Sequence, residues 1–82
     1  MKSEIFNDAI SNRRRVRFLY GSEEVILEPY YISINPSGKK SLFGRIDQTN
    51  QIKMFRYDNI FNIRILNSNK FSPIIPIIAS YN

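Results

Sequence analysis

The sequence contains no cysteine and no histidine. Without cysteine, the chain has no disulfide framework, no thiolate nucleophile and no cysteine-based metal site. Without histidine, it lacks the usual general acid–base near neutral pH and the commonest metal ligand. Zinc hydrolase chemistry and Ser-His or Cys-His nucleophile systems are therefore excluded within this chain.

A catalytic site built on a carboxylate or a lysine remains open, but no motif supports one. Glu23 and Glu24 belong to a predicted turn of residues 21–24, and Glu28 and Asp47 carry no sequence signature of a catalytic pair. The three glycines are isolated, so no glycine-rich loop is available to hold phosphates. We therefore expect a protein that is not an enzyme, with no catalytic residue, cofactor or metal.

Long hydrophobic runs are also missing. The N-terminal residues 1–8 have no apolar segment typical of a signal peptide. The most apolar stretch, residues 73–79, is interrupted by Pro76 and is far too short to span a membrane. We expect a cytoplasmic protein with no membrane partner.

The chain does have enough apolar and basic residues to suggest a small binding domain. At 82 residues there is room for one domain with a modest core, to which 43% hydrophobic residues contribute, six Phe and five Tyr among them. The formal net charge of +5 attracts polyanions such as nucleic acid. The alternative is that this charge only keeps a small protein soluble.

Hydrophobic periodicity predicts one helix followed by five strands. Residues 3–12 form an apolar helical stripe with Ser3 as the predicted N-cap and Glu4 in the first turn. Alternation then predicts strands separated by turn-forming residues, with a bend near Pro29 and a bulge or close approach at Gly44. The expected strands are residues 15–20, 25–34, 42–46, 52–57 and 60–65.

A meander of this size tends to curl into a barrel that closes its own edges. The predicted fold is therefore mainly β with one N-terminal helix, as a small five-stranded β-barrel. In one domain, residues 1–12 form a helix packed on the barrel and residues 13–66 form the barrel. Residues 67–82 form an extended C-terminal arm, packed on the barrel or on a neighbouring molecule.

Four segments of the chain, in this order, resemble the WYL domain, a small Sm-like barrel found mostly in bacteria. They are Ala9–Tyr20, Leu27–Ile32, Leu42–Asp47 and Lys53–Ile60. The resemblance implies a regulatory module that senses a ligand or binds nucleic acid. Where the family has its naming tryptophan–tyrosine–leucine, this chain has Ser41-Leu42-Phe43, and Asn59 replaces a common second arginine. The helix-turn-helix that usually precedes the domain has no counterpart before Arg13, so we expect a short stand-alone form.

The densest basic cluster, residues 13–17, is a candidate phosphate site. Arg15 and Arg17 are predicted to share one strand face, and their guanidinium groups match phosphate oxygens. The alternative is a solvent-facing strand whose arginines pair with Glu23, Glu24 or Glu28.

Arg56 is the candidate that the resemblance favours for anion binding, assisted by Arg45 and Lys53. It is predicted to share a strand face with Ile52 and Met54, whereas Lys53 has the opposite parity. The alternative is a structural ion pair with Asp58, which we otherwise interpret as a turn-former that caps backbone amides.

Aromatic residues alternate with these cations, as in proteins that stack the bases of single-stranded nucleic acid. Most aromatics in a small barrel belong to the core, and we expect Tyr30 or Tyr31 to be the exposed stacking residue. The sequence thus predicts a basic, aromatic-lined face that binds a nucleotide-like ligand or single-stranded nucleic acid. Its residues are Arg15, Arg17, Tyr30, Tyr31, Arg45, Lys53 and Arg56. The alternative is an assembly subunit that oligomerises through barrel edges and the Phe71–Tyr81 arm.

Overall fold

The computed structural model describes residues 1–75 and contains the predicted elements in the predicted order. Helix α1 spans Lys2–Ser11, and a short 3-10 helix, η1, spans Tyr57–Asn59. The strands are β1 (Val16–Tyr20), β2 (Glu23–Ile34), β3 (Lys40–Ile46), β4 (Ile52–Arg56) and β5 (Ile60–Ile65). No helix in this part of the chain is long and apolar enough to cross a membrane.

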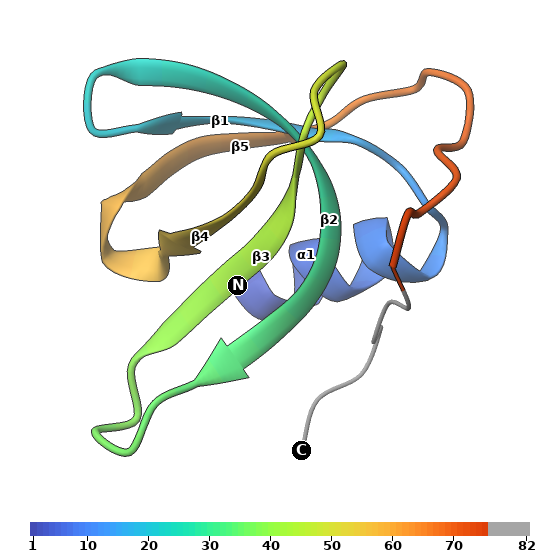
Figure 1. Cartoon of the computed structure of the whole chain (residues 1–82). Helices are drawn as coiled ribbons and strands as arrows, with labels where there is room; N and C mark the ends of the chain where they lie inside the picture. The colour runs from blue at the N-terminus through green and yellow to red at the C-terminus, as the bar shows by residue number, and fades with distance from the viewer. Residues whose placement is uncertain (76–82) are drawn as a thin grey trace.

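The five strands form one antiparallel sheet in the order β4-β3-β2-β1-β5, and the sheet is strongly bent (Figure 1). Within residues 1–75 no ladder joins β4 to β5, so the sheet is open and the predicted closed barrel is not confirmed. The reason lies where β4 ends. Helix η1 turns the chain between the two strands, and the Arg56 amide donates a hydrogen bond to the Tyr20 hydroxyl, 3.2 Å away, rather than to β5.

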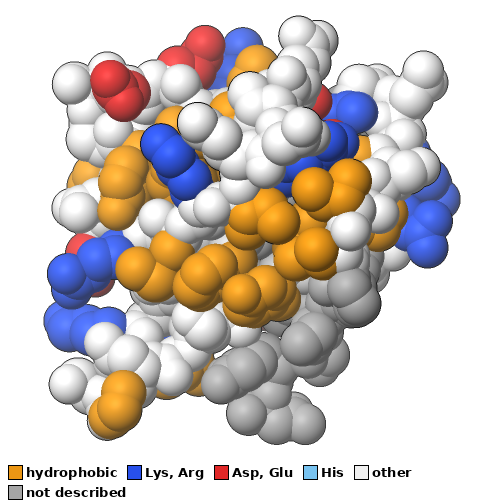
Figure 2. Space-filling model, in the orientation of Figure 1, with side chains coloured by type: hydrophobic (Ala, Val, Ile, Leu, Met, Phe, Trp, Pro, Cys, Tyr) orange, Lys and Arg blue, Asp and Glu red, His pale blue; other side chains and the backbone are white. Residues whose placement is uncertain are grey.

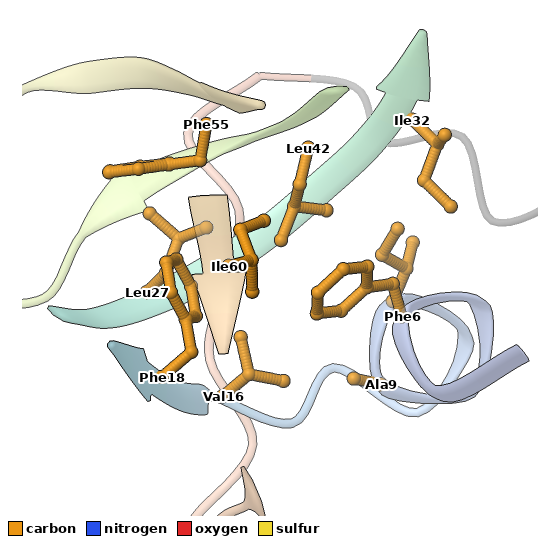
Figure 3. Close-up of a cluster of buried hydrophobic side chains, with 10 residues drawn as sticks. Phe6, Ala9, Val16, Phe18, Leu27, Ile32, Leu42, Phe55 and Ile60 are labelled. Carbon is orange, nitrogen blue, oxygen red and sulfur yellow. The ribbon is translucent and has the colours of Figure 1, made fainter. Parts of the chain in front are cut away.

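The inner face of the bent sheet is filled by aromatic and aliphatic side chains. Phe55 of β4 makes edge contacts with Phe18 and Tyr20 of β1, with ring centroids 5.3 and 5.0 Å apart. These contacts join the two ends of the sheet through side chains where the backbone ladder is absent. Figure 3 shows Phe55, Phe18 and Leu27 on one side of the core, opposite the helix.

Helix α1 packs its apolar stripe into this core. Phe6, Ala9 and Ile10 are fully buried, and Figure 3 shows Phe6 directed from the helix toward Ile60 and Leu42. The predicted N-cap at Ser3 is wrong, because the helix begins at Lys2 and Met1 occupies the cap position. Ser3 instead lies in the first turn, with its hydroxyl 3.0 Å from that of Tyr57.

The turn between β1 and β2 is shorter than predicted. Glu23 and Glu24 belong to β2, opposite Tyr20 and Leu19. Two residues suffice for the connection because Gly21 adopts a φ of +61°, a conformation that glycine reaches without strain.

The predicted bend and close approach in β2 and β3 are both present. The β2–β3 register shifts between Pro29 and Tyr31, which marks a β-bulge at the proline. A Cβ atom on Gly44 would lie only 2.2 Å from the Glu28 carbonyl oxygen, so only glycine fits there. The bulge determines which β2 side chains reach the outer face.

The described part of the C-terminal arm packs on its own chain. Phe71 is buried and stacks on Tyr30, with ring centroids 5.8 Å apart, and its amide donates to the Arg13 carbonyl. Figure 1 shows this segment beside the loop that follows α1. The rest of the predicted arm, residues 76–82, lies outside the described residues.

Candidate functional site

The seven predicted site residues do not form a single cluster. Arg45 makes a two-pronged contact with Glu28, with both nitrogen–oxygen distances 2.9 Å. Arg15 also approaches Glu28, at 3.6 Å, and binds Asp47 at 2.9 Å. The Glu28 side chain is only 1% exposed. These two arginines therefore neutralise a buried carboxylate and are not free for a ligand.

The sheet register explains this arrangement. Glu28 is the direct cross-strand partner of Arg45, so the two side chains leave the sheet on the same face. The hydrogen bond to Glu28 raises the pKa of Arg45, which remains a cation at any physiological pH. Arg15 also donates to the Asn69 carbonyl at 2.8 Å and thereby holds the C-terminal segment over the pair.

Tyr30 belongs to the same buried network. Its hydroxyl donates to Glu28 at 3.3 Å and accepts the Ile74 amide at 3.0 Å. Burial raises the pKa of this hydroxyl. Tyr30 is fully buried with Phe71 stacked on it, so its prediction as an exposed stacking residue is wrong. We name Arg15, Glu28, Tyr30, Arg45 and Asp47 the Glu28 network.

Arg17 and Lys53 lie elsewhere. Arg17, on β1, pairs with Glu24 at 3.5 Å, which is the alternative considered from the sequence. Lys53 is exposed on β4 and, within residues 1–75, has no ion pair. The alternation of β4 directs it away from the face that carries Arg56, as its parity predicted.

An aromatic surface nevertheless exists on the outer face of β2, β3 and β4. Tyr31 and Phe43 are cross-strand partners whose rings stack at 4.6 Å with an interplanar angle of 11°. Met54 is the next partner across the sheet and is 51% exposed. Figure 2 shows a band of hydrophobic side chains crossing these strands, with Lys and Arg side chains at its left end.

Arg56 lies two residues from Met54 on the same face of β4, as predicted. It is exposed, and no acid within residues 1–75 pairs with it, because Asp58 lies 3.7 Å from Lys39 instead. The register places Arg56 opposite Ser41, which is itself opposite Ser33. A hollow of about 290 Å³ opens here. Its lining residues are Ser33, Ile34, Asn35, Lys39, Ser41, Met54 and Arg56.

We name Tyr31, Phe43, Met54, Ser41 and Arg56 the aromatic platform. Tyr31 and Arg56 are the only two of the seven predicted site residues that it includes. Phe43 and Met54 were not among the predicted site residues, although alternation around the buried Leu42 would have directed Phe43 outward. Chemically, the platform offers two half-buried aromatic rings and an exposed guanidinium group, which suit a base and a phosphate.

A comparison with known protein families identifies the fold that carries this platform. The model of the WYL domain matches residues 3–65. The chain belongs to the WYL domain family. Of the naming positions in this WYL domain, Leu42 is buried in the core, Ser41 is also buried although it borders the hollow beside Arg56, and Phe43 is half-buried on the platform.

One solved structure shares the fold. The WYL domain is similar to a structure described as Proteasome accessory factor B/C (PafBC) of Arthrobacter aurescens, with a TM-score of 0.74 and 22% identity. The match covers 85% of this chain and 12% of that one, so this chain spans about one eighth of that protein's length. At this identity the likeness shows the fold alone. No curated protein matches the chain.

Proposed function

We propose that this WYL domain is a non-catalytic regulatory module of the cytoplasm that binds single-stranded nucleic acid, or a nucleotide-type ligand, on the aromatic platform. The observation that carries the proposal is the stacked Tyr31–Phe43 pair beside an arginine with no acid partner within residues 1–75. The other basic residues predicted for the site support the proposal less, because three of them pair with acids.

The binding mode follows from the register. A base that stacks over Phe43 places its sugar–phosphate toward β4, where Arg56 extends from the neighbouring strand. Guanidinium forks match phosphate oxygens in geometry and charge. The base contributes π-stacking, which is tolerant of sequence, so we expect weak preference among bases and clear preference for single strands over duplex.

The test is fluorescence anisotropy with a labelled oligonucleotide of about 10 nucleotides and with a duplex of the same length. Phe43→Leu keeps an apolar side chain but removes the aromatic face. We expect it to weaken single-strand binding about 5- to 150-fold, because each stacked base contributes about 1–3 kcal/mol. Arg56→Gln removes one phosphate contact and should also weaken binding.

Lys53→Gln is the matched control, since it removes one positive charge from the same strand on the opposite face. We expect it to change affinity less than twofold at moderate salt. Absence of binding at low and at moderate salt discards the nucleic-acid proposal. Equal losses in Arg56→Gln and Lys53→Gln would mean that attraction is diffuse and that the platform is not the site.

A second proposal is an assembly subunit that joins copies through the sheet edges. Within residues 1–75, β4 and β5 each leave one edge unpaired, and Phe61 of β5 is 52% exposed. Light scattering on the intact chain and on a version that ends at Ser72 tests it. A monomer at high concentration in both would remove this proposal, whereas an oligomer of the intact chain alone would assign assembly to the arm.

A further inference from the structure

A second hollow, of about 450 Å³, lies on β1 and β5, away from the platform. Its lining residues are Arg17, Phe18, Leu19, Glu24, Asn62, Ile63 and Arg64. Arg17 and Arg64 are direct cross-strand partners and both line it. Like charges placed directly opposite each other destabilise a sheet unless something neutralises them.

The local backbone is irregular at this point. The β1–β5 register shifts between Arg17 and Leu19, so Asn62 and Ile63 both face the single residue Phe18. Asn62 adopts a φ of +55°, a left-handed conformation that asparagine tolerates better than most residues. This bulge bends β5 and brings the Asn62 amide to the hollow beside the two arginines.

The charges around the hollow do not balance. Glu24 pairs with Arg17 at 3.5 Å, but both side chains are substantially exposed, at 59% and 42%, so the contact is weak. In the described part of the chain, Arg64 has no ion pair within 4.0 Å. Two cations therefore meet one exposed carboxylate, and an anion with several oxygens would satisfy both.

We infer that this hollow binds a phosphate group between Arg17 and Arg64, with the Asn62 amide as a further donor. Two guanidinium groups provide the paired N–H donors that phosphate oxygens accept. Glu24 acts as the competitor that leaves Arg17 when phosphate enters. The site shares no residue with the aromatic platform, so this inference does not depend on the proposed function.

The experiment is titration of the full chain with inorganic phosphate, followed by ¹H–¹⁵N NMR at constant ionic strength. We expect saturable shifts at the amides of residues 17 and 62–64, and little change at residues 31, 43 and 56. Arg64→Gln should weaken phosphate binding at least tenfold. Glu24→Gln should strengthen it severalfold, because the competing carboxylate is gone.

Lys53→Gln is the matched control, since it removes one exposed positive charge outside both sites, and it should leave phosphate binding at this hollow unchanged. Each of the substituted side chains is exposed, so we expect the variants to keep the fold. The dispersion of amide signals in the same NMR spectra checks this. Shifts that never saturate, or affinities that respond to neither Arg64→Gln nor Glu24→Gln, would overturn the inference. If the unmodified chain binds phosphate at this hollow but binds no oligonucleotide, the result counts against the platform proposal and leaves this inference standing.

Discussion

The central ion pair of the Glu28 network joins Arg45 to Glu28. We predict that removing the arginine destabilises the fold more than removing the glutamate charge does. Arg45→Met leaves a carboxylate that is 1% exposed, with only Arg15 at 3.6 Å and the Tyr30 hydroxyl near it. Glu28→Gln leaves two arginines that are 23% and 19% exposed and can turn toward water. We therefore expect Arg45→Met to be the more destabilising substitution.

The magnitudes follow from burial. Stranding a buried charge by removing its partner costs about 3–5 kcal/mol of unfolding free energy. Glu28→Gln preserves the shape and some of the hydrogen bonds, so we expect a cost of about 1–2 kcal/mol. A domain of this size has a total stability of roughly 4–12 kcal/mol, so Arg45→Met brings the protein close to unfolding.

Urea unfolding followed by circular dichroism measures the difference. At a denaturant slope of about 1–2 kcal/mol/M, a 2 kcal/mol gap between the variants moves the midpoint by about 1–2 M. The double variant Glu28→Leu/Arg45→Met removes both charges and should recover much of the stability lost in Arg45→Met.

The reasoning would be refuted if Glu28→Gln were as destabilising as Arg45→Met, or if the double variant were less stable than Arg45→Met. Either result would mean that the carboxylate is not the buried member of the pair in solution.

Three further substitutions test the surroundings of this network. Phe71→Ala removes a side chain that is 2% exposed, and we expect a loss of about 2–3 kcal/mol, with faster hydrogen exchange in residues 67–75 as the check. Gly44→Ala places a Cβ 2.2 Å from the Glu28 carbonyl oxygen, and thermal unfolding should show a loss of about 3 kcal/mol. Burial raises the pKa of the Tyr30 hydroxyl above its ordinary value of 10.0. The contribution of the neutral hydroxyl to the free energy of unfolding is therefore complete below pH 10 and is lost as the pH rises further. Tyr30→Phe should show less of this alkaline loss in urea titrations at pH 8 and above pH 10.

The strands could be predicted from the sequence because alternation and turn residues act locally. Closure of the barrel could not, because it depends on whether strands 52–56 and 60–65 meet again after the corner at Asp58-Asn59. That corner forms a 3-10 turn, and the resulting separation of β4 and β5 is a property of the whole sheet.

In the candidate site too, features set within one strand could be predicted from the sequence, whereas contacts between strands could not. The parity of Arg56 and Met54 on one strand was predicted correctly, because it needs no knowledge of neighbouring strands. The pairing of Arg45 with Glu28 depends on the β2–β3 register, which the bulge after Pro29 shifts. The same bulge brings Tyr30 under Phe71, so reasoning from adjacent residues could not tell Tyr30 from Tyr31.

Several arginines pair with acids of the same chain, and this pairing predicts how nucleic-acid binding depends on salt. If all five cations predicted from the sequence contacted phosphates, log K would fall with log salt at a slope of about −3.5 for a single strand. Arg15 and Arg45 are committed to Glu28, while Arg17 and Lys53 lie off the platform. Arg56 remains, together with Lys39, whose exposed pair with Asp58 at 3.7 Å is easily displaced. Two contacts give a slope of about −1.4. Anisotropy titrations between about 50 and 300 mM salt measure this slope. Over that range the Debye length falls from about 14 to about 6 Å. A slope near −3.5 would mean that the paired arginines release their acids on binding, and the division between structural and binding cations would then be wrong.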